Sequence, residues 1–259
     1  MIPLADFDAV CQRAARLAGQ VLLDWAGRFR VREKGPADLV TEADLASQEV
    51  IRETLLGAFP GHGFLAEENL AIASSDDNYR WIVDPLDGTT NYVHGIPQYA
   101  VSIALEQSGK LLVGAVYDPV ADECFSAVAG GGAWLGQKRL HASGQQALSH
   151  AVVAMSFPPG ARRDTPEVQE FLEILERAQS MRRTGSSALN LCYLAAGRFD
   201  GYWSGSTRIW DIAAGVLLVQ EAGGLVTDRH GAPFAVDPPH FIAAATPQLH
   251  AELSKLLVH

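Results

Sequence analysis

The residues with the most distinctive chemistry lie in segment 81–91, which reads WIVDPLDGTTN. The apolar run before Asp84 predicts a strand that ends at this carboxylate, and Pro85 fixes φ and disfavours a helical conformation at Asp84. A turn after Pro85 is expected to return Asp87 to the same side. The two carboxylates and the Leu86 carbonyl can therefore converge as a set of oxygen ligands.

The residues that follow offer hydrogen-bond donors to an anion. Gly88 lets the backbone approach a ligand closely, and the N–H groups of Gly88 and Thr89 open a predicted helix. Clustered carboxylates without cysteine or histidine at ligand spacing favour Mg²⁺ or Mn²⁺ over zinc. Bound cations would reverse the local negative field, so the same loop could hold a phosphate group. The alternative is an ordinary strand-to-turn signal in which Asp84 acts as a cap.

Further acidic residues could join this loop, although each has an ordinary structural explanation. Glu67 and Glu68 end a predicted strand and could be solvated charges. Asp211 stands at a predicted helix start, and Asp44 follows Thr41 at capping-box spacing, so both could be helix caps. Taken one at a time, these residues do not distinguish a metal site from local helix and strand chemistry.

Hydrophobic periodicity predicts the elements that must position these side chains. It favours helices over 4–26 and from Thr41 to Phe59, followed by an antiparallel meander of short strands. These strands are expected at 63–66, 81–84, 99–106, 111–117 and 124–129. After about residue 145, strands and helices alternate as in α/β structure. The later strands are expected at 151–156, 181–183, 199–203, 225–227 and 241–245, and the later helices at 166–179, 189–196, 212–222 and 248–257.

Length and composition limit what these elements can form. The chain has 259 residues, of which 48% are hydrophobic and 19% are charged, the mix of a folded protein with a large core. The change of pattern predicts an N-terminal α+β lobe at 1–145 with most candidate ligands, and a C-terminal α/β lobe at 146–259 that completes the site. No apolar run reaches the roughly 18 residues that a membrane-spanning helix needs.

Charge and cysteine content narrow the class of partner. A formal net charge of −10 disfavours nucleic acid and anionic membranes, because their phosphates would be repelled. An odd number of widely spaced cysteines, which are Cys11, Cys124 and Cys192, fits a reducing cytoplasm and buried thiols. The run Gly130-Gly131-Gly132 lacks the Lys-Ser/Thr ending of a P-loop and is predicted to be a hairpin turn.

In combination and in this order, four segments resemble the inositol monophosphatase family of Mg²⁺-dependent, lithium-sensitive phosphomonoesterases. The segments are 34–44 (KGPADLVTEAD), 66–68 (AEE), 84–91 (DPLDGTTN) and 210–215 (WDIAAG). The likeness covers nearly the whole chain. It implies a layered α-β-α-β-α sandwich of the sugar-phosphatase type, in the α+β or α/β class, with the site between the lobes. A homodimer is the usual state of the family.

The resemblance also implies roles for individual residues. The implied metal ligands are the Leu86 carbonyl and the carboxylates of Glu67, Asp84, Asp87 and Asp211. They would hold two or three Mg²⁺ ions, with Asp84 bridging a pair. Thr89 and Asp44 would be the catalytic residues that orient a metal-activated water and help to remove its proton. Lys34 would lie on a flap near the site.

Substrate contacts are where the chain departs from the family pattern. Members that prefer inositol usually carry a glutamate seven residues before the aspartate of the Trp-Asp motif, and here that position is Ser204. Serine is shorter and uncharged, so an inositol contact would be lost or passed to water. Arg208 could bind a second anionic group or be an ordinary surface arginine. The substrate contacts implied by the resemblance are Asp87, Gly88, Thr89, Gly185, Ser187 and Ser204.

The implied activity is Mg²⁺-dependent hydrolysis of a small phosphomonoester, inositol 1-phosphate or a similar polyol phosphate, by a metal-activated water. Because of Ser204, histidinol phosphate, fructose 1,6-bisphosphate and 3′-phosphoadenosine 5′-phosphate remain alternative substrates. The expected partner is this small substrate, with no nucleic acid and no membrane. A regulatory binding protein on the same fold is the non-enzymatic alternative, which is disfavoured because such scaffolds usually lose a metal ligand.

Overall fold

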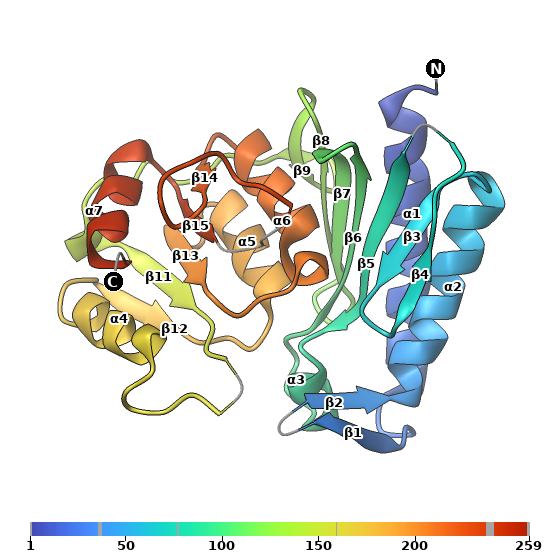
Figure 1. Cartoon of the computed structure of the whole chain (residues 1–259), viewed down its shortest axis with the longest axis horizontal. Coiled ribbons are helices and arrows are strands. Elements are labelled where there is room, and N and C mark those ends of the chain that lie inside the picture. Colours follow the sequence, from blue (N-terminus) through green and yellow to red (C-terminus); the bar gives the residue numbers. More distant parts are fainter. Residues whose placement is uncertain (1, 36–37, 77, 159, 237–240, 258–259) are drawn as a thin grey trace.

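Helices and sheets alternate in five layers across the molecule, as Figure 1 shows for the computed structural model. The structure describes residues 2–35, 38–76, 78–158, 160–236 and 241–257, and for 33–35 and 38 it describes the backbone alone. The side chain of Lys34 therefore lies outside the described residues. The α-β-α-β-α sandwich implied by the family resemblance is confirmed.

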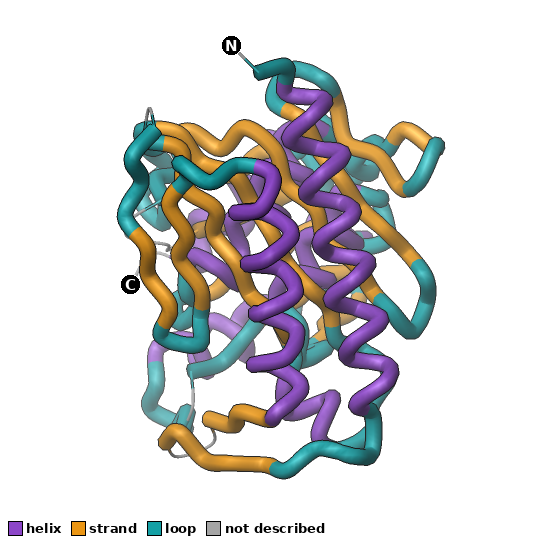
Figure 2. The backbone as a smooth tube through the Cα atoms, turned by 90° about the vertical axis from the view of Figure 1, so that its right-hand side faces the viewer, coloured by secondary structure: helices purple, strands orange, loops and turns teal. Residues whose placement is uncertain are grey.

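The outer layer on one side consists of helices α1 (Leu4–Trp25) and α2 (Glu42–Ala58), which run side by side over one face of the large sheet (Figure 2). Both helices were predicted from their apolar periodicity. At the start of α2, the Thr41 hydroxyl accepts a hydrogen bond from the Ala43 N–H, and the Asp44 carboxylate accepts one from the Thr41 N–H. This capping box fixes Asp44 on the first turn of the helix.

The large sheet has the strand order β10-β9-β8-β7-β6-β5-β3-β4. Its strands are β3 (Gly63–Ala66), β4 (Leu70–Ile72), β5 (Tyr79–Asp87), β6 (Ala100–Gln107), β7 (Lys110–Asp118), β8 (Glu123–Val128), β9 (Gly132–Leu135) and β10 (Lys138–Arg139). The predicted antiparallel meander holds from β5 to β10 but is wrong for β3, which pairs parallel to β5. The hairpin partner β4 causes this difference, because it takes the chain back along β3 before β5 begins.

The second half of the chain supplies the remaining layers. Helices α5 (Ser187–Ala195) and α6 (Ile209–Glu221) lie between the two sheets, and α4 (Pro166–Leu175) and α7 (Pro247–Leu257) cover the far face (Figure 1). The second sheet has the order β12-β11-β13-β15-β14. Its strands are β11 (Val152–Met155), β12 (Ser180–Arg182), β13 (Gly201–Ser204), β14 (Leu225–Thr227) and β15 (Phe241–Ala244).

Differences from the predicted elements are confined to short or terminal pieces. Helix α4 ends at Leu175 and not at residue 179, because the chain makes a tighter turn directly after Leu175 and then enters β12. The strands β1 (Val31–Gly35) and β2 (Asp38–Thr41), the short helix α3 (Thr89–Val93) and the turn of 3-10 helix at Leu148–His150 complete the described elements. The strands β1, β2, β4 and β10 were not among the predicted elements.

One core crosses the predicted boundary at residue 145. A cluster of buried residues joins Ile82 and Val116 of the large sheet to Leu191 of α5 and Leu218 of α6. Helix α6 lies so close to β7 that a Cβ on Gly114 would be 3.0 Å from the Ala214 Cα. The two-lobe division stays a prediction, and the shared core indicates that the lobes are held together firmly.

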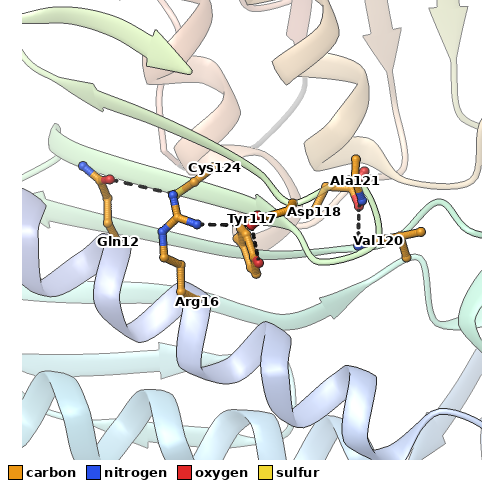
Figure 3. Close-up of polar contacts among 8 residues, drawn as sticks. Gln12, Arg16, Tyr117, Asp118, Val120, Ala121 and Cys124 are labelled. Carbon is orange, nitrogen blue, oxygen red and sulfur yellow. Dashed lines mark hydrogen bonds and ion pairs between the residues drawn. The ribbon is translucent and has the colours of Figure 1, made fainter. Parts of the chain in front are cut away.

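Figure 3 shows polar contacts within the turn between β7 and β8 and between α1 and Tyr117 at the end of β7. The buried Asp118 carboxylate accepts hydrogen bonds from the N–H groups of Val120 at 2.9 Å and Ala121 at 3.0 Å. The guanidinium of Arg16 on α1 lies 5.2 Å from the centre of the Tyr117 ring. The contact between Arg16 and Tyr117 adds to the apolar packing that holds α1 against the sheet.

The sequence predicted buried thiols and a hairpin turn at the glycine run 130–132. The three cysteines are buried and unpaired. Gly130 lies in the turn between β8 and β9 and Gly132 is the first residue of β9, and their N–H groups donate to the Glu221 carboxylate at 2.7 and 2.8 Å, so a side chain of the protein occupies this glycine-rich hairpin. Among the described residues, no helix is both long enough and apolar enough to cross a membrane.

Candidate active site

The parallel pairing of β3 with β5 brings Glu67 and Asp84 to the same edge of the sheet. Ala66 pairs with Val83 at the ends of these strands, and the Glu67 N–H donates to the Val83 carbonyl at 3.2 Å. The residues that directly follow this pair, Glu67 and Asp84, are therefore neighbouring carboxylates. The prediction of an antiparallel meander did not contain this arrangement, although the two acidic residues themselves were identified.

A β-bulge in β5 brings Asp87 into the same region as Asp84. Asp84 pairs with Ser102 and Asp87 pairs with Ala100, so three residue steps on β5 match two on β6. The extra residue on β5 reverses the usual alternation of side chains, so Asp84 and Asp87 come to the same side of the strand. The predicted turn was expected to have this effect. The Ser47 hydroxyl of α2 donates to the Pro85 carbonyl at 2.8 Å and holds the bulge from behind.

The N-termini of α5 and α6 hold two of the carboxylates. The Asp87 carboxylate accepts hydrogen bonds from the Ser186 hydroxyl and from the Ala188 N–H at 2.8 Å, at the start of α5. On the first turn of α6, the Asp211 carboxylate accepts one from the Arg208 N–H at 2.8 Å. Both carboxylates thus lie where helix dipoles favour negative charge.

The acidic side chains lie close enough to oppose one another's ionisation. Burial raises the pKa of Asp84 well above its usual range. The neighbouring carboxylates of Glu67, Asp87 and Asp211 raise the Asp84 pKa further. Burial also raises the pKa of Asp87 to about 6, although hydrogen bonds from the start of α5 work in the opposite direction. A site of this kind gains stability from a bound cation.

The donor set fits a hard divalent cation in its chemistry. All the implied ligands are oxygens, and one buried oxygen nearby, Oδ1 of Asp44, has no hydrogen-bond partner within the described part of the chain. No group of three or more His, Cys, Asp or Glu side chains among the described residues is arranged to hold a metal ion as it stands. The Asp84, Asp87 and Asp211 carboxylates accept hydrogen bonds from backbone N–H groups, which hold them in place and leave further lone pairs on each carboxylate.

The two residues predicted to be catalytic have separate partners in the structure. The Thr89 hydroxyl donates to the Leu86 carbonyl at 3.1 Å, and the Asp44 carboxylate accepts from the Thr41 hydroxyl at 2.5 Å. Burial raises the pKa of Asp44 to about 6, with smaller contributions from the charges of Glu68 and Glu67. Asp44 is therefore placed near the acidic cluster, and a carboxylate with this pKa can accept a proton near neutral pH.

Close backbone approach at the predicted phosphate end depends on glycine. Gly88 has φ of +93°, and a Cβ there would lie 3.1 Å from the Gln98 carbonyl oxygen and 3.3 Å from that of Gly185. The first helical hydrogen bond of α3 runs from the Tyr92 N–H to the Gly88 carbonyl, so the N–H groups before it have no acceptor in that helix. Gly88 and Gly185 thus lie side by side in the structure.

A cavity of about 200 Å³ adjoins Asp211 and includes two of the predicted substrate contacts, Gly185 and Ser187. Ser204 does not line it: this residue is only 1% exposed, and its hydroxyl accepts a hydrogen bond from the Ser206 N–H at 3.2 Å. The lining residues that sequence reasoning missed are Ser156, Phe157, Arg183, Ser206 and Thr207. Arg208 is exposed and is not part of the wall. The missed residues carry no motif, so only their packing reveals them.

Comparison with known proteins identifies the group to which this chain is related. The family model described as "Inositol monophosphatase family" matches residues 4–259. The chain belongs to the inositol monophosphatase family. The curated relatives include an inositol-1-monophosphatase of Rhizobium meliloti, 46% identical over 204 residues that cover 78% of this chain and 77% of the relative. They also include the Nus factor SuhB of Pasteurella multocida, 40% identical over 248 residues that cover 94% and 93%.

Solved structures of family members share the whole architecture. The native crystal structure of the extragenic suppressor protein SuhB from Bartonella henselae superimposes with a TM-score of 0.91 at 40% identity, covering 96% of this chain and 97% of that one. The inositol monophosphatase from Anabaena superimposes with a TM-score of 0.88 at 37% identity, covering 98% and 96%. The fold of the chain is therefore that of the inositol monophosphatase family.

Ser186 offers a test of how the α5 terminus holds this family site. Its hydroxyl donates to the Asp87 carboxylate and accepts from the Leu189 N–H at 3.2 Å, so it is also the N-cap of α5. Ser186→Ala is expected to lower the free energy of unfolding by about 1–2 kcal/mol, because a cap and a charge-assisted hydrogen bond are lost together. Chemical denaturation measures this change. Ser186→Thr, which keeps the hydroxyl, should lose less than half as much, and an equal loss in both variants would contradict this assignment.

Proposed function

We propose that the chain is a Mg²⁺-dependent phosphomonoesterase that hydrolyses a small polyol phosphate, of which inositol 1-phosphate is the first candidate. The observation that carries this proposal is the proximity of the buried Asp84 and Asp87 of β5 to Glu67, which follows β3, and to Asp211 of α6, because these carboxylates oppose one another's ionisation and so favour a cation. Membership of the inositol monophosphatase family supports the same activity. The relatives named inositol-1-monophosphatase support this choice of substrate.

Different residues of the chain would bind the metal, bind the phosphate and accept a proton in this reaction. Glu67, Asp84, Asp87, Asp211 and the Leu86 carbonyl would hold Mg²⁺. When bound, Mg²⁺ supplies Lewis-acid chemistry and neutralises charge on the phosphoryl group. The N–H groups of Gly88 and Thr89 would bind the phosphate oxygens. Asp44, whose pKa burial raises to about 6, would accept a proton from the attacking water, which the Thr89 hydroxyl would help to orient.

A phosphate-release screen with and without Mg²⁺ tests this function. The panel contains inositol 1-phosphate, histidinol phosphate, fructose 1,6-bisphosphate and 3′-phosphoadenosine 5′-phosphate. Turnover of at least one phosphomonoester is expected with Mg²⁺ and none with a chelator. Mn²⁺ should substitute, and Li⁺ at fixed Mg²⁺ should inhibit. Absence of turnover across the panel at any Mg²⁺ concentration would rule the proposal out.

The relatives named Nus factor SuhB favour a second candidate function, in which the folded chain acts as a regulatory binding protein for the transcription machinery. The two functions separate experimentally, because binding need not involve the carboxylates. A variant that has lost its metal ligands should lose phosphatase activity and keep a partner captured through another surface. The assembly state is a further proposal, and the homodimer expected for the family can be checked by light scattering.

A further inference from the structure

Two buried serine hydroxyls donate hydrogen bonds to the backbone beside the proposed metal ligands. Ser47 on α2 has no exposed surface, and Ser102 on β6 is 1% exposed. Each donates to a backbone carbonyl in a segment that carries proposed ligands, segment 84–87 for Ser47 and segment 210–211 for Ser102. Neither serine is among the ligands, catalytic residues or substrate contacts that the family resemblance implies.

Ser47 supplies a hydrogen bond where the β-bulge interrupts the sheet. The register between β5 and β6 shifts after Asp84, which leaves Pro85 and Leu86 without a paired residue on β6. The Ser47 hydroxyl donates to the Pro85 carbonyl at 2.8 Å. The N–H of the same peptide group donates to the Asp84 carboxylate at 2.9 Å. One peptide group is therefore held at both ends, and its orientation fixes that of the Asp84 carboxylate.

Ser47 also joins the bulge to the helix that carries the proposed proton acceptor. Asp44 and Ser47 are three residues apart on α2, and residues at this spacing lie on the same face of a helix. Both residues are fully buried. A shift of α2 relative to β5 would break the bond from Ser47, so this bond ties the position of Asp44 to that of the bulge.

Ser102 joins the strand of Asp84 to the helix of Asp211. It pairs directly with Asp84 between β5 and β6, and the side chains of paired residues project from the same face of a sheet. Helix α6 packs on that face, and the Ser102 hydroxyl donates to the Trp210 carbonyl at 3.2 Å. This carbonyl and the Asp211 N–H belong to one peptide group. The bond from Ser102 therefore limits the distance between Asp84 and Asp211.

We propose that Ser47 and Ser102 are positioning residues of the metal site, whose hydroxyls hold segments 84–87 and 210–211 at a fixed spacing and thereby give the site its preference for Mg²⁺ over larger cations. This inference rests on the proposed phosphatase function. Mg²⁺ demands nearly ideal octahedral coordination at about 2.0–2.1 Å, whereas Ca²⁺ accepts flexible arrangements of oxygens at about 2.3–2.6 Å. A site whose ligands are free to move therefore loses affinity for Mg²⁺ before it loses affinity for Ca²⁺.

Calorimetric titration of the metal-free protein with Mg²⁺, and separately with Ca²⁺, tests this role without substrate. Ser47→Ala and Ser102→Ala are each expected to weaken Mg²⁺ binding by about tenfold or more, the usual effect of removing a group that orients a metal ligand. Ca²⁺ binding should weaken by less than about threefold, so the ratio of the two affinities should fall. Ser47→Thr and Ser102→Thr, which keep the hydroxyl, should restore most of the parent's ratio.

Ser126→Ala is the matched control. Ser126 is a buried serine of the same sheet, 5% exposed on β8, and its hydroxyl accepts a hydrogen bond from the Gln12 side chain at 3.2 Å. Because this bond joins β8 to α1 and involves no segment with a proposed ligand, its loss should lower stability and leave the ratio of Mg²⁺ to Ca²⁺ affinity unchanged. Chemical denaturation of every variant in a chelator separates a loss of stability from a loss of positioning.

The outcomes separate this inference from the function on which it rests. If the parent binds Mg²⁺ and releases phosphate, but a serine-to-alanine variant keeps the parent's ratio of Mg²⁺ to Ca²⁺ affinity, the assignment of that serine is overturned and the phosphatase stands. The same conclusion follows for both serines if Ser126→Ala lowers the ratio as much as they do. If the parent neither binds Mg²⁺ nor hydrolyses any phosphomonoester, the proposed function fails and the inference fails with it.

Discussion

Asp84→Asn is expected to lower Mg²⁺-dependent phosphate release by about a thousandfold or more, because Asp84 lies at the centre of the acidic cluster. If Asp84 is a metal ligand as proposed, its loss would remove several kcal/mol of metal-derived stabilisation from the transition state, and about 1.4 kcal/mol corresponds to a tenfold change in rate. Steady-state kinetics over a range of Mg²⁺ concentrations measures the effect. Asp164→Asn, at an exposed carboxylate before α4, is the matched control and should retain full activity.

The same variant should leave the metal-free protein as stable as the parent or more stable. Burial and neighbouring carboxylates raise the pKa of Asp84 well above its usual range, so its charge opposes folding when no cation is present. Asparagine removes that charge and can still accept the hydrogen bond from the Leu86 N–H, which is 2.9 Å long. Thermal denaturation should also show that Mg²⁺ raises the Tm of the parent and not of the variant. Full activity in Asp84→Asn would exclude the proposed metal site.

The contrast between what the sequence predicted and what the structure adds is clearest in this acidic cluster. Asp84 and Asp87 could be identified because an apolar strand, a proline and a glycine follow one another within a few residues. This order of residues restricts the local backbone conformation whatever the rest of the fold. Their convergence was expected from a turn and is achieved by a bulge. The parallel pairing that brings Glu67 beside Asp84 could not be predicted, because register between distant strands depends on tertiary packing.

The residues that line the cavity beside Asp211 were even harder to predict from the sequence. Ser204 was identified by its position before the Trp-Asp motif, but the structure places Ser206 and Thr207 on the wall and not Ser204. A loop of small polar residues has no periodicity, so which of its side chains faces inward is decided by the elements around it. Arg183 was likewise invisible, because an arginine beside another arginine resembles an ordinary charged surface.

Gly215 has the largest expected effect among residues that touch no ligand. It lies in the middle of α6, four residues after Asp211, and a Cβ there would be 2.5 Å from the Leu191 Cβ of α5. Alanine normally improves a helix by about 0.5–1 kcal/mol over glycine, whereas overpacking a core costs about 1–3 kcal/mol. Because the clashing atom is a Cβ and not the end of a flexible chain, we expect the clash to dominate and Gly215→Ala to lose about 2 kcal/mol.

Gly57→Ala is the matched control, because Gly57 lies within α2 and a Cβ there would have no neighbour within 4 Å. That variant should gain about 0.5–1 kcal/mol, so the two alanine variants should shift Tm in opposite directions. Gly215→Ala should also lower kcat, because α5 and α6 carry Ser187 and Asp211 into one site and a displacement of about 1 Å between catalytic groups can cost a hundredfold in rate. Equal stability in both variants would mean that α5 and α6 can separate freely, and the close contact of these helices would not be what fixes Asp211.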